Sequence, residues 1–108
     1  MMTTFEEFQN LAAKVPMALR NDRDRIDLPV LGLQQEAGKL GKLLSAGFAS
    51  GKFQLTPAQS EGVKDRMADA LWCIARLCGE TGISMEDVAQ HGIAQLRERA
   101  KAIDPNQR

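Results

Sequence analysis

The chain has 108 residues, enough for one domain with a modest hydrophobic core. Its 14 Lys and Arg residues balance 14 Asp and Glu residues, so the formal net charge is zero at pH 7. This balance argues against a protein whose main role is to bind nucleic acid, which would carry an excess of positive charge.

The cysteines and the N-terminus indicate the compartment. Cys73 and Cys78 are five residues apart in an apolar run, a spacing that matches neither a redox CxxC motif nor a paired zinc ligand set. We expect two buried, reduced thiols. The N-terminus carries Glu6 and Glu7 and has no basic start followed by an apolar core, so neither secretion nor membrane insertion is indicated. We expect a cytoplasmic protein.

The first predicted helix begins at Thr4, which has the spacing of a capping box with Glu7. Its apolar stripe comprises Phe8, Leu11, Ala12 and Val15. Pro16 should end or kink this helix, because proline lacks the backbone N–H that a helix interior needs. The charged, aperiodic segment 20–27 then suits an exposed connection.

The second predicted helix begins with Asp27 as its cap and Pro29 in its first turn, and it ends near Gly47. Its apolar stripe comprises Leu33, Ala37, Leu40 and Leu44. Gly38 and Gly41 each cost about 1 kcal/mol relative to alanine in a helix. We therefore expect a neighbouring helix or a ligand to approach the backbone closely at these two positions.

Two further helices follow. Thr56 caps a long third helix with Pro57 at its first position, and Gly82 ends it. Between residues 67 and 78 this helix is apolar on nearly every side, so it should be the central element. Ser84 and Asp87 have the spacing that starts a fourth amphipathic helix, whose apolar positions are Val88, Ile93 and Leu96.

These elements predict an all-α fold, an antiparallel bundle of four to five helices. We expect a single domain over residues 1–108, with an N-terminal helix and connection at 1–26, core helices at 27–101 and a frayed tail at 102–108. One copy of so short a chain cannot cover a third helix that is apolar on several sides. We therefore expect a homo-oligomer, most simply a two-fold dimer.

The candidate functional residues are acids on the second and third helices. Glu36 interrupts the apolar stripe of the second helix, either as a solvated flank residue or as a metal ligand lining a cleft. Glu61, Asp65 and Asp69 are spaced four apart and share one strip of the third helix. Asp69 lies among strongly apolar residues, where it either pairs with a base such as Arg66 or binds Mg²⁺ with an acid from a facing helix.

Two sequence stretches, "LGLQQEAGKLGKLL" and "VKDRMADALWCIARLCGETGISMEDV", resemble the MazG-like branch of the all-α nucleoside triphosphate pyrophosphohydrolases. The similarity runs from about residue 31 to about residue 99. It implies an oligomer of helical bundles, a dimer or tetramer, in which an EExxE motif and an ExxD motif hold Mg²⁺. Such a site cuts a nucleoside triphosphate to the monophosphate and pyrophosphate.

The resemblance assigns roles to particular residues of this chain. Glu36 and Asp69 would be the catalytic acids and, together with Asp65, the metal ligands. Lys39, Arg66 and Trp72 would face the nucleotide substrate. On the residues alone, a core position for Trp72 is favoured over a role as a base-stacking platform.

The chain departs from both acidic motifs. Gln35 and Lys39 replace two acids of the first motif, and Arg66 replaces one acid of the second. If all five positions shared a cleft, these replacements would shift its charge by about five units in the positive direction. Such a cleft would hold a metal weakly, or it would attract an anion through Lys39 and Arg66. Alternatively, Lys39 and Arg66 form structural ion pairs with Glu36 and Asp69.

Three functions are consistent with these observations. The first is a Mg²⁺-dependent nucleotide pyrophosphohydrolase with weakened or altered activity. The second is a non-catalytic homo-oligomeric helical module that binds a nucleotide, another anion or a protein partner. The third is a helix-turn-helix over "LCGETGISMEDVAQHGI", which ranks last because the chain carries no net positive charge. The one histidine, His91, has no identifiable nucleophile to activate.

Overall fold

The computed structural model describes residues 4–103. Within this range the chain forms helices and no strands, which confirms the predicted all-α class. The helices are α1 (Phe5–Lys14), α2 (Asp24–Ala46), α3 (Pro57–Thr81) and α4 (Met85–Lys101).

The helix boundaries follow local capping chemistry. Hydroxyl groups accept hydrogen bonds from first-turn backbone N–H groups at the starts of α1, α3 and α4, where the sequence predicts caps: Thr4, Thr56 and Ser84. At α3 the Gln59 side chain also accepts from the Thr56 N–H at 2.8 Å, which completes a capping box. Gly82 ends α3 with a φ of 70°, in the left-handed region that favours glycine. Each such cap stabilises its helix by about 1 kcal/mol.

The start of α2 differs from the prediction. The helix begins at Asp24 instead of after Asp27, so Pro29 occupies its sixth position and is fully buried. The cause is a local cluster: the Asp24 carboxylate accepts from the backbone N–H of Arg20 at 2.9 Å and from its guanidinium at 3.0 Å. The Asn21 side chain in turn accepts from the Asp24 N–H at 3.0 Å. These bonds support one extra helical turn before the proline.

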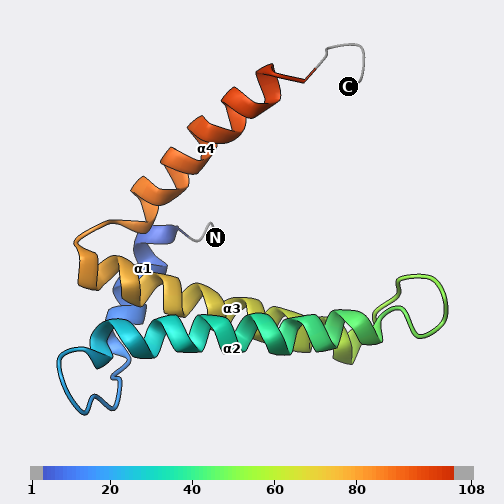
Figure 1. Cartoon of the computed structure of the whole chain (residues 1–108), viewed down its shortest axis with the longest axis horizontal. Helices are drawn as coiled ribbons and strands as arrows, with labels where there is room; N and C mark the ends of the chain where they lie inside the picture. Colours follow the sequence, from blue (N-terminus) through green and yellow to red (C-terminus); the bar gives the residue numbers. More distant parts are fainter. Residues whose placement is uncertain (1–3, 104–108) are drawn as a thin grey trace.

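The helices form a three-helix body and a projecting fourth helix (Figure 1). Helices α2 and α3 lie side by side as an antiparallel pair, and α1 packs against the C-terminal half of α3. Helix α4 leaves this body at its first turn (Figure 1). The antiparallel arrangement is therefore confirmed for α2 and α3, whereas α1 crosses α3 and most of α4 projects outside the body (Figure 1). Amphipathicity shows that a helix needs an apolar partner but does not identify that partner.

The main core lies where α1, α3 and the start of α4 meet. Its buried members are Ala12, Ala75, Cys78 and Met85. The Gln9 side chain on α1 ties α4 to this core: its Oε1 accepts from the Met85 N–H at 2.8 Å, and its Nε2 donates to the Ile83 carbonyl at 3.2 Å. The direction in which α4 leaves the body is thus fixed at its first turn.

Helix α3 is central, as predicted, and it supplies both free cysteines to the interior, Cys73 and Cys78. Part of its apolar surface is not buried within one chain, because Met67 remains exposed. Among residues 4–103, none of the helices has the length and apolar character that crossing a bilayer requires.

Among residues 4–103, no neighbouring helix approaches the two mid-helix glycines of α2, so that half of the expectation is wrong, and the approach of a ligand stays a prediction. A Cβ atom placed on Gly38 or Gly41 would meet no heavy atom of the chain within 4 Å. A close contact instead occurs at Gly32, where a Cβ would lie 3.0 Å from the Cys73 sulfur. Gly32 therefore sets how closely α2 approaches α3.

Candidate functional site

The two candidate catalytic acids lie at the same contact between α2 and α3, and Arg66 lies between them. The Arg66 Nη1 is 3.0 Å from the Glu36 Oε2 and donates to the Glu36 Oε1 at 3.3 Å. The Arg66 Nη2 is 3.2 Å from the Asp69 Oδ2. One guanidinium therefore neutralises an acid from each helix.

Lys39 completes the group, with its Nζ 3.6 Å from the Glu36 Oε1. We call Glu36, Lys39, Arg66 and Asp69 the ion-pair cluster. Glu36 is its buried centre, with 11% of the side chain exposed, whereas Lys39 and Asp69 are more than half exposed. Two bases and two acids give the cluster a formal charge of zero.

The helical repeat explains why these four side chains meet. Glu36 and Lys39 are three residues apart on α2, as are Arg66 and Asp69 on α3, so each pair occupies one face of its helix. The planar guanidinium has several N–H donors directed outward, which lets it bind two carboxylates at once. The antiparallel pairing of α2 and α3 then brings the two faces together.

The other acids of α3 lie outside this group. Within residues 4–103, Asp65 is exposed and forms no ion pair with the bases that hold Glu36 and Asp69. Glu61 pairs instead with Lys64 at 2.7 Å on the surface. Gln35 is exposed and stands outside the cluster. The strip of acids along α3 therefore does not form one site.

Trp72 is oriented toward α1 and not toward the cluster. It lines an apolar groove with Phe8 and Leu11, and its indole N–H is buried with no acceptor among the described residues. The Arg76 guanidinium lies 5.9 Å from its ring centroid. The structure therefore separates Trp72 from Lys39 and Arg66, the other residues expected to face a nucleotide.

The residues present do not fit the Mg²⁺ ion that the family resemblance implies. Mg²⁺ needs carboxylate oxygens that are free to coordinate it, but Arg66 engages both acids of the cluster. In the described part of the chain, no three His, Cys, Asp or Glu side chains converge as a metal-binding group. The ion-pair alternative drawn from the sequence matches the observed geometry.

Cys73 adjoins the cluster, which the sequence did not indicate. It is buried four residues after Asp69, on the same side of α3. Burial raises the pKa of its thiol, and the negative charges of Glu36 and then Asp69 raise this pKa further. The thiol therefore stays protonated and is a poor nucleophile. The four-residue spacing from Asp69 is the signal that would have placed it here.

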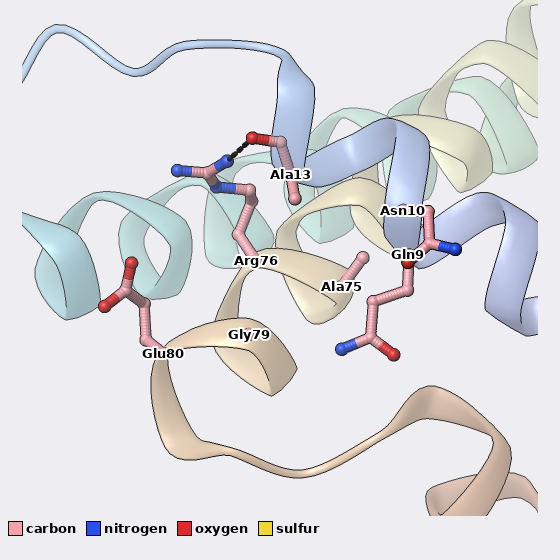
Figure 2. Close-up of a pocket in the computed structure, with 7 residues that line it drawn as sticks. All are labelled: Gln9, Asn10, Ala13, Ala75, Arg76, Gly79 and Glu80. Carbon is pink, nitrogen blue, oxygen red and sulfur yellow. Dashed lines mark hydrogen bonds between the residues drawn. The ribbon is translucent and has the colours of Figure 1, made fainter.

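A separate polar pocket of about 330 Å³ lies between α1 and α3 (Figure 2). Its main cation, Arg76, is already engaged: Nη1 lies within hydrogen-bonding distance of three carbonyl oxygens at the end of α1, those of Ala12, Ala13 and Val15. The Gln9 amide on the pocket wall is also engaged at both ends. These two groups stabilise the end of α1 and the start of α4, so neither is free to bind a ligand in the pocket.

The remaining candidates lie on α4. His91 is exposed, and the basic residues Arg97, Arg99 and Lys101 lie on the half of α4 that projects away from the body (Figure 1). Among these, Lys101 pairs with Glu98 at 3.1 Å. None of these residues belongs to the ion-pair cluster.

Comparisons with known proteins identify no matching family model, no matching curated protein and no matching solved structure. The MazG-like resemblance therefore rests on the two sequence stretches alone, and any function has to be argued from the geometry.

Proposed function

We propose that this chain is a non-catalytic, homo-oligomeric helical module that acts through protein contacts. The observation that carries this proposal is the position of Arg66, whose guanidinium binds Glu36 and Asp69 at 3.0 and 3.2 Å. The acids that would hold a metal in a MazG-like enzyme instead join α2 to α3.

The charges around Glu36 support this role. A divalent cation approaching Glu36 would have to displace a guanidinium and would be repelled by the nearby ammonium group of Lys39. Asp69 would lose its partner at the same time. The cluster also has no spare positive charge with which to hold a nucleotide phosphate, because each base has an acid beside it.

Exposed apolar side chains support the protein-contact part of the proposal. Apolar residues on all four helices keep about half of their surface in water, among them Leu11 on α1, Leu31 on α2, Met67 on α3 and Leu96 on α4. Apolar surface of this extent on a small domain is typical of an interaction site. A homodimer or a homotetramer would cover it.

A second candidate is a Mg²⁺-dependent nucleoside triphosphate pyrophosphohydrolase with weakened activity. The observation that favours it is that Glu36 and Asp69 share one contact between α2 and α3, as the resemblance requires of its metal-holding acids. In that case the ion-pair cluster would have to open when metal and nucleotide bind.

Pyrophosphate release separates these two functions. The full chain is incubated with Mg²⁺ or Mn²⁺ and a panel of canonical and modified nucleoside triphosphates, beside a Glu36→Gln control. The module proposal predicts no release above the level of the control. Release by the native chain that is lost in Glu36→Gln would overturn the proposal in favour of the enzyme.

A further inference from the structure

The chain exposes more surface than a compact protein of its mass. Its accessible area is 8353 Å², whereas a compact monomer of 11.9 kDa exposes about 5,900 Å². Its radius of gyration is 17.2 Å, against about 13 Å for a compact domain of this length. The excess area, about 2,400 Å², exceeds the roughly 800 Å² that each partner buries in a standard interface.

Part of the exposed surface is an apolar groove on the three-helix body. We call it the α1 face, and its walls are Phe8, Leu11, Ala12, Val15 and Trp72. The α1 residues recur at i, i+3, i+4 and i+7, so they form one stripe. The groove has a volume of about 190 Å³, and Leu11 and Val15 keep 55% and 52% of their surfaces exposed in it.

A second apolar surface runs along α4. Met85, Val88, Ala89, Ile93 and Leu96 lie on one side of this helix. Only Met85, at its beginning, is buried; Val88 and Ala89 line a small groove with Phe5, and Val88 keeps 47% of its surface exposed. The stripe then continues along residues 90–101, which we call the α4 arm. Leu96, at its middle, is 61% exposed.

One chain does not bring these two surfaces together. Helix α4 starts beside Phe5, at the first turn of α1, whereas the α1 face extends toward Val15 at the other end of that helix. The hydrogen bonds from Gln9 and the burial of Met85 fix the direction in which α4 departs. The arm therefore points away from the α1 face of its own chain (Figure 1).

We propose that a second copy of this chain covers both surfaces, with the α4 arm of each copy lying on the α1 face of the other. Each copy presents one arm and one face, so a two-fold axis satisfies both at once in an isologous contact. The copies carry no net charge and therefore do not repel each other over long range. The accessible area that each copy exposes beyond a compact monomer is large enough for such an interface.

This inference rests on the proposed function and adds the partner and the surface through which it binds. The inference and the absence of catalysis fail separately. A monomer that releases no pyrophosphate would overturn the inference, together with the homo-oligomeric part of the proposed function, and would leave the absence of catalysis intact. A dimer that releases pyrophosphate would overturn the absence of catalysis and leave the inference intact.

The first test measures the mass of the native full chain by sedimentation equilibrium over a range of concentrations. Leu96→Glu alters the arm, Leu11→Glu alters the α1 face, and Phe48→Glu is the control, an exposed apolar residue in the α2–α3 loop far from both (Figure 1). We expect a dimer, or a dimer of dimers, for the native chain and the control. Each interface variant should raise the dimer Kd by at least about 100-fold, because a carboxylate would be buried without a partner. Circular dichroism verifies that the variants stay helical.

The second test mixes two variants, L96K and L11E. In the proposed exchange the mixed dimer keeps one native arm-on-face contact, and in the other contact the introduced charges attract each other. The mixture should therefore dimerise at least about tenfold more tightly than either variant alone. A native chain that stays monomeric at about 100 µM would overturn the inference. So would a native dimer whose Kd neither interface variant raises, or a mixture of L96K and L11E that dimerises no more tightly than either variant alone.

Discussion

The Arg66 guanidinium on α3 lies 3.0 Å from the Glu36 carboxylate on α2, and this pair is the centre of the contact between the two longest helices. Glu36 is nearly buried, with 11% of its side chain exposed. A carboxylate in that position requires a positive partner, because burying an unpaired charge costs several kcal/mol. The ion pair therefore has a structural role whatever else the cluster does.

Arg66→Ala should destabilise the chain by about 1–3 kcal/mol, because it leaves Glu36 without its main partner. The double variant Arg66→Met with Glu36→Gln should recover part of this loss by removing both charges. Urea denaturation followed by circular dichroism measures both effects.

The matched control for Arg66 is Lys64→Ala, which breaks the exposed pair with Glu61. Its cost should be below about 0.5 kcal/mol, since water already solvates both groups. Equal losses for Arg66→Ala and Lys64→Ala would show that the Glu36–Arg66 pair is no more important than a surface pair.

Gly38→Ala and Gly41→Ala should each stabilise the monomer fold by about 0.5–1 kcal/mol, because the added methyl group meets open space and alanine is the better helix former. Gly32→Ala should show no such gain, because its Cβ would press on the Cys73 sulfur at 3.0 Å. Thermal denaturation of the three variants gives this comparison. A loss of stability at Gly38 or Gly41 would mean that something approaches the backbone there after all.

Stability in acid should depend on Asp24. Hydrogen bonds from the Arg20 side chain and then its backbone lower the Asp24 pKa below the ordinary value of 3.8. Between the lowered pKa and the ordinary one, the folded state therefore binds fewer protons than the unfolded state. The contribution of Asp24 to the free energy of unfolding is complete above about pH 4 and is lost as pH falls through the lowered pKa. Asp24→Asn should make the acid decline of stability shallower than in the native chain.

Asp22→Asn is the control for this effect, because the Asp22 side chain is fully exposed. Its acid unfolding curve should match that of the native chain. An unchanged curve for Asp24→Asn would show that the Arg20–Asp24 bonds do not persist in solution.

The thiol of Cys73 should react slowly while the chain is folded. Its pKa is raised by burial and by the charges of Glu36 and Asp69, so iodoacetamide at pH 8 should modify it many times more slowly than in urea. The folded state retains the Cys73 proton to higher pH than the unfolded state does. The contribution of this thiol to the free energy of unfolding is therefore complete below the ordinary pKa of 9.0, and it is lost as pH rises through the raised pKa. Mass spectrometry after timed alkylation resolves Cys73 from Cys78. Equal rates in buffer and in urea would contradict the buried placement.

The sequence predicts those features of the fold that depend on neighbouring residues. The caps at Thr4, Thr56 and Ser84 and the stop at Gly82 need only a few adjacent positions, and all four are confirmed. The start of α2 is wrong because Asp24 is held by hydrogen bonds with Arg20 and Asn21, which outweigh the signal of the proline five residues later.

Features that depend on residues distant in sequence are harder to predict. The resemblance to the two acidic motifs groups Glu36, Lys39, Arg66 and Asp69, and it allows both a metal site and an ion-pair cluster. Only the positions of the side chains separate these alternatives. The Gln9 bonds that fix α4 join residues more than 70 positions apart, and no local pattern indicates them.

Binding of Mn²⁺ tests the central claim, that the ion-pair cluster leaves no carboxylates free for a metal. Electron paramagnetic resonance counts the Mn²⁺ bound by the native chain and by the double variant Lys39→Glu with Arg66→Glu, which returns acids to both positions. We predict no specific binding by the native chain and a gain of bound Mn²⁺ in the variant. Binding of Mn²⁺ by the native chain that Glu36→Gln abolishes would contradict the claim.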